Sequence, residues 1–182
     1  MTWNVPFEGT DVRGLSKRYR AQDSYQAGVS NAEADRKLAD ILTAARRRGH
    51  MQPSDLEEVA RWKYPGPAVR NMVALNSFVD VEEISRVSFA TDSERLRIGA
   101  LMTLNGVAGP MASVILHFVF PDRYPVLDKR VMRTIGAPIA YQYDRWLQYG
   151  EFCRRAASDY GVTLRILDEA LWQYDYERRP RG

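Results

Sequence analysis

A glycine-rich stretch at residues 104–112 (LNGVAGPMA) lies between two apolar segments that have helical spacing. Gly106 can adopt a positive φ without steric cost, so the chain can turn sharply there. Pro110 has no N–H to lose in the first turn of the second helix. An anion such as a phosphate would be held by the positive helix end and the turn amides. These amides belong to Gly106, Val107, Ala108 and Gly109. The alternative is an ordinary helix-turn-helix corner without a ligand.

A single carboxylate, Asp128, follows Gly106 by 22 residues and comes directly after the run 124–127 (YPVL). Just before the segment KRVMR it would cap a helix, which contributes about 1 kcal/mol. Backbone amides that hold a carboxylate also favour its ionised form. An ionised carboxylate can stabilise positive charge that develops on a sugar ring. Capping and chemistry are compatible, so the sequence leaves both roles open.

The hairpin, the spacing and the aspartate together resemble the helix-hairpin-helix (HhH-GPD) DNA glycosylase superfamily. The family pattern Leu-Pro-Gly-Val-Gly-x-x-x-Ala is matched at Leu104, Gly106, Val107 and Ala112. The segment 128–136 resembles the helix that begins at the catalytic aspartate of that family. The close match covers residues 104–136, and the remainder agrees only as a helical pattern of suitable length.

This resemblance implies an all-α, two-lobed fold, DNA as the partner, and a target nucleotide flipped out of the duplex. It implies hydrolysis of an N-glycosidic bond that leaves an abasic site, with Asp128 stabilising the sugar cation, orienting a water molecule, or both. Lys129, Arg130 and Arg133 are expected to be further DNA contacts. The resemblance also allows a monovalent cation at the hairpin, and no other cofactor is expected. Neither the excised base nor the group that protonates it is identified, and a role in repair or in defence against foreign DNA remains open.

The chain departs from the family pattern at several positions. Asn105 replaces the usual proline, and Ala108 replaces the second glycine of the hairpin. Pro110 occupies the position at which strand-nicking members carry a lysine, so no Schiff-base lyase activity is expected from this position. Cys153 is the only cysteine, which excludes the four-cysteine iron–sulfur cluster of some members and an internal disulfide. The sequence therefore predicts an enzyme without an iron–sulfur cluster and with glycosylase but no lyase activity (a monofunctional glycosylase).

Three side chains outside the motif are candidates for the base pocket. Trp62 could stack on a flipped base, and Lys63 could contact a phosphate or a polar base edge. Tyr124, four residues before Asp128, could line the same pocket. Each also has a packing interpretation: a core tryptophan, a lysine at a helix end, and a tyrosine packed in an extended loop. The two histidines are too far apart in sequence to indicate a metal site, and no metal is expected.

Composition places the chain among soluble, single-domain proteins. It has 182 residues, 45% hydrophobic residues and a net charge of +3, with a basic isoelectric point. This charge permits a nucleic-acid partner without requiring one. The sequence contains no signal pattern and no apolar run long enough for a membrane span. A cytoplasmic monomer with one domain over residues 1–182 is therefore expected.

The periodicity of apolar residues predicts helices and no sustained strand. Residues 1–29 are expected to be irregular, because several glycines interrupt them. Ser30 and Glu33 form a capping box for a helix that ends at Gly49, and further helices are expected after it. Their predicted ranges are 53–63, 67–75, 80–88, 92–103, 110–120, 128–136, 141–160 and 164–177.

Two other functions remain alternatives to the glycosylase. One is a non-catalytic DNA-binding protein that uses the hairpin only to grip the backbone. The other is a helical interaction protein in which the hairpin is structural and Asp128 is only a cap.

Overall fold

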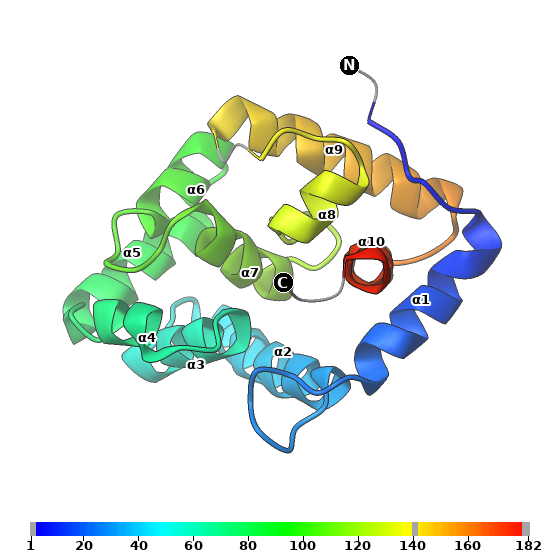
Figure 1. Cartoon of the computed structure of the whole chain (residues 1–182). Helices are drawn as coiled ribbons and strands as arrows, with labels where there is room; N and C mark the ends of the chain where they lie inside the picture. Colours follow the sequence, from blue (N-terminus) through cyan, green and yellow to red (C-terminus); the bar gives the residue numbers. More distant parts are fainter. Residues whose placement is uncertain (1–2, 140–141, 180–182) are drawn as a thin grey trace. The chain divides into compact units, whose positions relative to one another are not determined.

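The computed structural model describes residues 3–139 and 142–179, and these residues form an all-α fold of ten helices (Figure 1). Two compact units are present. The central unit consists of residues 23–119. The terminal unit joins the two ends of the chain, with residues up to 22 and from 120 onward. The prediction of an all-α fold is confirmed for the described residues. Tyr141, where one predicted helix was to begin, lies outside them.

Six helices build the central unit: α2 (Asn31–Arg48), α3 (Pro53–Lys63), α4 (Pro67–Val73), α5 (Phe78–Ala90), α6 (Glu94–Leu101) and α7 (Gly109–Val119). Helix α7 packs against α2, α3 and α6. Its residues from Met111 to His117 are all buried, as expected for a helix that is apolar on nearly every face. The hairpin before α7 is therefore attached to the best-buried helix of this unit.

Local signals fix the boundaries of these helices. Ser30 and Glu33 form the predicted capping box, and Gly49 ends α2 with a φ of 83°. Pro67 is the first residue of α4, a position that suits proline because an N–H there would have no partner within the helix. The predicted helices of the central unit are all confirmed, with ends shifted by a few residues.

The terminal unit contains α1 (Gly9–Ala21), α8 (Lys129–Thr134), α9 (Tyr143–Asp159) and α10 (Leu164–Arg178). Helix α10 packs against the other three, and Figure 1 shows it beside α1. Val12 and Leu15 of α1 form a buried cluster with Ala170 of α10. The buried carboxylate of Glu169 also joins the two helices, because it accepts hydrogen bonds from Ser16 and Arg20.

The prediction that residues 1–29 are irregular is wrong, because α1 spans Gly9–Ala21. Its buried residues Val12, Leu15, Ser16 and Tyr19 follow helical spacing. The glycines do not break the helix. Gly9 lies at its first turn, where a Cβ atom would come within 2.9 Å of the Tyr160 ring. Close packing on Tyr160 therefore explains a glycine that looks like a helix breaker in the sequence.

Candidate functional site

The hairpin lies between α6 and α7, as predicted. Gly106 has a φ of 78°, in the left-handed region that favours glycine. Leu104 and Val107 are buried on either side of it and anchor the turn in the core of the central unit. The amide of Val107 donates to the carbonyl oxygen of Leu104 (3.1 Å), which closes the turn.

Gly106 also approaches α4 closely. A Cβ atom at this position would lie 2.8 Å from Cγ1 of Val73 and 3.1 Å from Cβ of Met72. Real Cβ atoms essentially never come as close as 2.8 Å to another atom, and a distance of 3.1 Å is tighter than nine in ten of their contacts, so packing as well as φ favours glycine here. Gly106 therefore has a structural role in packing the hairpin on α4, and this role does not depend on a ligand.

Asn105, which replaces the proline of the family pattern, is held by Asn76. The amide of Asn105 donates to Oδ1 of Asn76 (2.8 Å), and Nδ2 of Asn76 donates to the carbonyl oxygen of Asn105 (3.0 Å). Nδ2 also donates to the carbonyl oxygen of Val73 (2.8 Å). Proline at position 105 could not donate the first of these bonds. The asparagine that replaces the family's proline is thus bonded to Asn76, which fixes the hairpin on the turn between α4 and α5 (residues 74–77).

Asn105 and Ala108 are the exposed residues of the hairpin, Gly106 is half-buried, and Gly109, the first residue of α7, is buried. The first N–H groups of a helix have no acceptor within that helix, and the helix dipole makes this end positive. Asn105 and Val107 use their amides inside the unit. Of the other hairpin amides, those of Gly106 and Ala108 belong to residues with exposed surface, so these two are the donors that we consider for an anion.

Asp128 caps α8, as predicted. Its φ and ψ are extended, and Oδ1 accepts a hydrogen bond from the amide of Arg130 (2.8 Å). The four residues before it, 124–127, are buried, whereas Asp128 itself is half-buried. A buried extended segment thus ends in a carboxylate whose orientation is set by the first turn of a helix.

Arg130 and Arg133, which were expected to contact DNA, both pair with Asp175 of α10. Nη1 of Arg130 lies 2.8 Å from Oδ2 of Asp175, and Nη2 of Arg133 lies 2.7 Å from the same oxygen. The Asp175 side chain is buried, whereas the two guanidinium groups are partly exposed. This cluster joins α8 to α10. Nothing in the sequence singled out Asp175, which lies more than 40 residues from both arginines.

The same cluster contains an aromatic stack. The rings of Trp172 and Tyr176 are stacked with centroids 5.1 Å apart, and the guanidinium of Arg130 lies 5.2 Å from the Trp172 centroid. Burial acts to raise the pKa of Asp175, but the hydrogen bonds from Arg133 and Arg130 outweigh it and lower that pKa. Both arginines keep partly exposed surface, so contact with DNA stays a prediction. Lys129, the first residue of α8, is exposed.

The stability of this cluster depends on the charge of Asp175. We expect Asp175→Asn to lower the free energy of unfolding by about 2 kcal/mol, because two arginines lose a buried anionic partner. This corresponds to a decrease in Tm of roughly 4–8 °C at pH 7. Glu177→Gln, which removes the more exposed Arg18–Glu177 pair from the same helix, should cost about 0–1 kcal/mol.

The pH dependence has a definite sign. The lowered pKa of Asp175 means that its contribution is complete above the ordinary value of 3.8 and is lost as the pH falls through the folded-state pKa. The difference in Tm between wild type and Asp175→Asn should therefore shrink in acid. An equal difference at pH 7 and at low pH would contradict this assignment. Differential scanning fluorimetry across pH measures the Tm of the wild type and of Asp175→Asn.

The base-pocket candidates have packing partners within their own units. Nε1 of Trp62 donates to Asp35 of α2 (2.9 Å), and its ring meets Phe118 of α7 edge to face, with centroids 5.5 Å apart. Lys63 is half-buried at the end of α3. Tyr124 is buried beside Phe120. These contacts support the packing interpretation of Trp62 and Tyr124, and a role in binding a base stays a prediction.

The predicted site residues are divided between the two units. The hairpin, Trp62 and Lys63 belong to the central unit. The terminal unit holds Asp128 with its capped helix, Tyr124 and the basic residues of α8.

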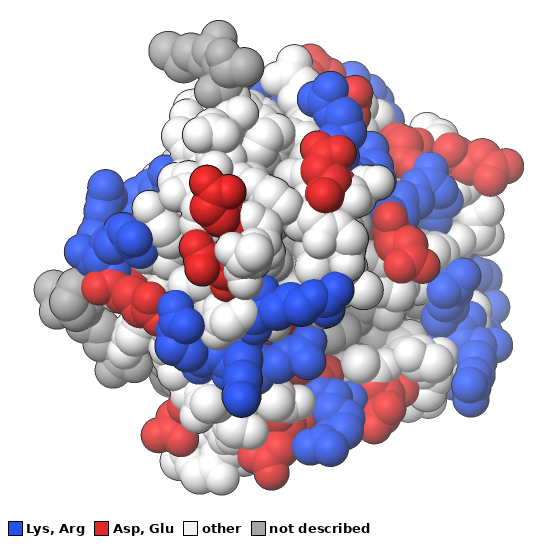
Figure 2. Space-filling model, turned by 90° about the vertical axis from the view of Figure 1, so that its right-hand side faces the viewer, with Lys and Arg blue, Asp and Glu red and all other residues white. Residues whose placement is uncertain are grey.

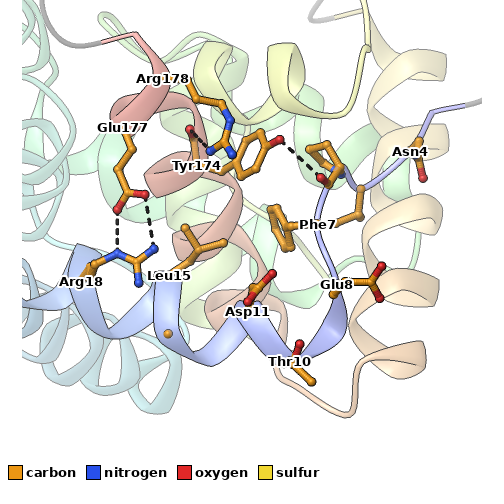
Figure 3. A pocket seen from close by; sticks show the side chains of 13 residues that line it. Asn4, Phe7, Glu8, Thr10, Asp11, Leu15, Arg18, Tyr174, Glu177 and Arg178 are labelled. Carbon is orange, nitrogen blue, oxygen red and sulfur yellow. Dashed lines mark hydrogen bonds and ion pairs between the residues drawn. The ribbon is translucent and has the colours of Figure 1, made fainter.

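The terminal unit also has a groove of about 560 Å³, and none of these residues lines it (Figure 3). It is lined by the segment 4–8, by α1 and by the end of α10. Arg18 and Glu177 form an ion pair at one side, and the hydroxyl of Tyr174 donates to the carbonyl oxygen of Pro6 (3.3 Å). The ion pair joins α1 to α10, and the Tyr174 bond fastens the segment 4–8 to α10. Asp128 does not line this groove.

Basic residues on α1 also have structural partners. Figure 2 views the side on which α1 lies and shows Lys and Arg side chains gathered near the middle, with Asp and Glu around them. Arg18 pairs with Glu177, and Arg20 pairs with the buried Glu169. Two of the basic residues in the run 17–20 therefore join α1 to α10, and their positive charges are balanced by carboxylates of α10.

No family model, curated protein or solved structure matches the chain. None of the helices in the described residues has both the length and the apolar composition needed to cross a membrane.

Proposed function

We propose that this protein is a monofunctional DNA N-glycosylase with a helix-hairpin-helix glycosylase fold. The observation that carries the proposal is the pairing of two local structures at the spacing of that superfamily. One is a hairpin with a positive-φ glycine at the start of α7. The other is Asp128, 22 residues later, which follows a buried extended segment and caps a helix.

In this proposal the hairpin binds the DNA backbone. A phosphate oxygen accepts hydrogen bonds from the amides of Gly106 and Ala108, and the positive end of α7 adds a favourable charge interaction. Backbone contacts of this kind fix the position of the protein on the duplex and carry no sequence information. Affinity should therefore vary little with DNA sequence and fall as salt increases.

Apolar side chains beside the hairpin suit the same role. Met72, Leu75, Phe78 and Val79, around the α4–α5 turn, are each about half exposed or more. Asn76 fastens this turn to Asn105 of the hairpin. Apolar side chains that enter a groove can separate stacked bases, which lowers the cost of flipping a nucleotide. A phosphate held at the hairpin would bring DNA to these side chains.

Asp128 is the proposed catalytic residue. As the bond between C1′ and the base breaks, positive charge develops on the sugar, and the carboxylate stabilises it. Water then adds to C1′, the base leaves with a proton, and an abasic site remains. In the cap, Oδ1 accepts a hydrogen bond from the Arg130 amide, which holds one oxygen of the carboxylate in place.

The experiment that tests this function is a survey of substrates. Purified protein is incubated with DNA duplexes that carry alkylated, deaminated, oxidised or hypermodified bases, and abasic sites are scored by cleavage in alkali. We expect excision of at least one class of base. Binding to DNA with no excision in the whole panel would instead support the non-catalytic DNA-binding protein. A protein that neither binds DNA nor excises a base would instead favour the helical interaction protein.

The identity of residue 110 predicts the type of product. With proline in place of lysine, the protein has no amine at that position to attack C1′. Products should be intact strands that contain abasic sites, and borohydride should trap no covalent protein–DNA adduct. A trapped adduct would show that another amine acts as the nucleophile, and the monofunctional assignment would then be wrong.

A further inference from the structure

The segment that leads to Asp128 is docked on α9 by two side chains of that helix. The hydroxyl of Tyr149 donates to the carbonyl oxygen of Val126 (2.8 Å), and Nη1 of Arg154 donates to the carbonyl oxygen of Arg123 (2.8 Å). Residues 124–127 are buried and belong to no helix or strand. Backbone carbonyls buried in this way need donors from elsewhere, and α9 provides one for Val126.

Gly150, next to Tyr149 on the buried face of α9, contributes to this docking. A Cβ atom at Gly150 would lie 3.1 Å from Nη1 of Arg154 and 3.8 Å from Cδ of Pro125. The bare backbone leaves room for the arginine that holds Arg123, while Pro125 lies in ordinary contact distance of that position. Tyr149, Gly150 and Arg154 thus form one surface that receives the extended segment.

We propose that Tyr149 is a positioning residue for Asp128, because its hydroxyl holds the backbone two residues before the carboxylate. This inference rests on the proposed glycosylase function. A reacting group must be held within about 0.5 Å of its productive position. The helix cap fixes the carboxylate relative to α8. The Tyr149 bond fixes the preceding backbone relative to α9, so that Asp128 is held from both sides.

The chemistry of the phenol suits a permanent tether. Tyr149 is completely buried, and burial is the main cause that raises its pKa, with further increases from Cys153, Asp168 and Asp128. The hydroxyl therefore stays protonated over the pH range in which the protein works, and it remains a hydrogen-bond donor. A role as a proton-transfer group is not required.

The test compares two identical substitutions in the terminal unit. Tyr149→Phe removes the hydroxyl and keeps the ring. Tyr160→Phe is the matched control, because the Tyr160 hydroxyl also donates to a distant carbonyl oxygen, that of Phe7 (3.3 Å), away from Asp128. We expect kcat for excision to fall roughly tenfold to a hundredfold in Tyr149→Phe, with KM nearly unchanged. Tyr160→Phe should keep the kcat of the wild type.

Amide hydrogen exchange gives a second readout that does not depend on activity. In Tyr149→Phe the amide of Arg130, which donates to Asp128, should exchange faster, while amides of α2 in the central unit keep their rates. If the tyrosine variant does not fold, Arg154→Met removes the other tether, and it should raise exchange at the same amide by a smaller factor.

Two results would overturn the proposal. One is a folded Tyr149→Phe variant with the kcat of the wild type. The other is unchanged exchange at Arg130. A wild-type protein that excises no base would instead overturn the proposed function, and with it the catalytic meaning of the tether. The exchange measurement would still show whether Tyr149 holds the segment in place.

Discussion

Asp128→Asn is expected to lower base excision by roughly 10²-fold or more, while the fold and the binding of DNA are retained. Asparagine caps helices about as well as aspartate. Its side-chain oxygen can accept the bond that Oδ1 now accepts from the Arg130 amide. It carries no negative charge, however, and so it cannot stabilise a sugar cation. The variant therefore separates the two roles that the sequence leaves open for this residue.

Three measurements on one preparation decide between the roles. Tm should stay within a few degrees of the wild type, DNA affinity by fluorescence anisotropy should be similar, and the yield of abasic sites should collapse. Asp128→Ala is a useful companion, because it removes the cap as well and should cost about 1 kcal/mol of stability. If the wild type excises a base and Asp128→Asn does so equally well, Asp128 is only a cap and the proposed mechanism fails.

In the central unit the helix boundaries were predictable, because the signals that set them are local. The capping box of Ser30 and Glu33, the positive φ of Gly49 and the position of Pro67 each involve residues within one or two turns. The hairpin belongs to the same group, since a glycine with positive φ between two apolar helices is written in consecutive residues. Sequence reasoning could therefore locate Gly106 and the cap at Asp128.

Contacts between distant residues were not predictable in this way. Arg130 and Arg133 look like free basic residues in the sequence, yet both pair with Asp175. Asn105 looks like a defect in the motif, yet its amide is bound by Asn76. Tyr149 carries no sequence signal that relates it to Val126. Each of these partners is brought close only by the packing of helices.

Helix α6 illustrates a related limit of apolar spacing. Ile98 and Leu101 are buried as their spacing predicts, but Leu96 is about half exposed. The buried polar residue is Arg97, whose guanidinium donates to the carbonyl oxygens of Ser88 (2.9 Å) and Phe89 (3.2 Å) at the end of α5. The arginine thus satisfies carbonyl groups that the end of a helix leaves without partners. Spacing alone would place a charged residue such as this one in solvent.

Gly106→Ala is expected to damage both stability and DNA binding, and Gly49→Ala is its matched control. Both glycines have positive φ, 78° and 83°, so alanine costs about 1–2 kcal/mol of conformational strain at either position. Only Gly106 has close neighbours, because a Cβ atom there would meet Val73 at 2.8 Å, whereas nothing lies within 4 Å at Gly49. Overpacking adds about 1–3 kcal/mol at Gly106 alone.

The hairpin must shift to relieve this contact, and its amides shift with it. We therefore expect Gly106→Ala to have the lower Tm of the two variants and to bind DNA roughly tenfold more weakly, by a similar factor for unrelated sequences, since the lost contacts are to backbone. Gly49→Ala should keep the affinity of the wild type. Thermal melts and fluorescence anisotropy at fixed salt, performed below both melting transitions, give the comparison. A folded Gly106→Ala variant with undiminished affinity would mean that the glycine serves packing on α4 alone and that the phosphate is bound elsewhere.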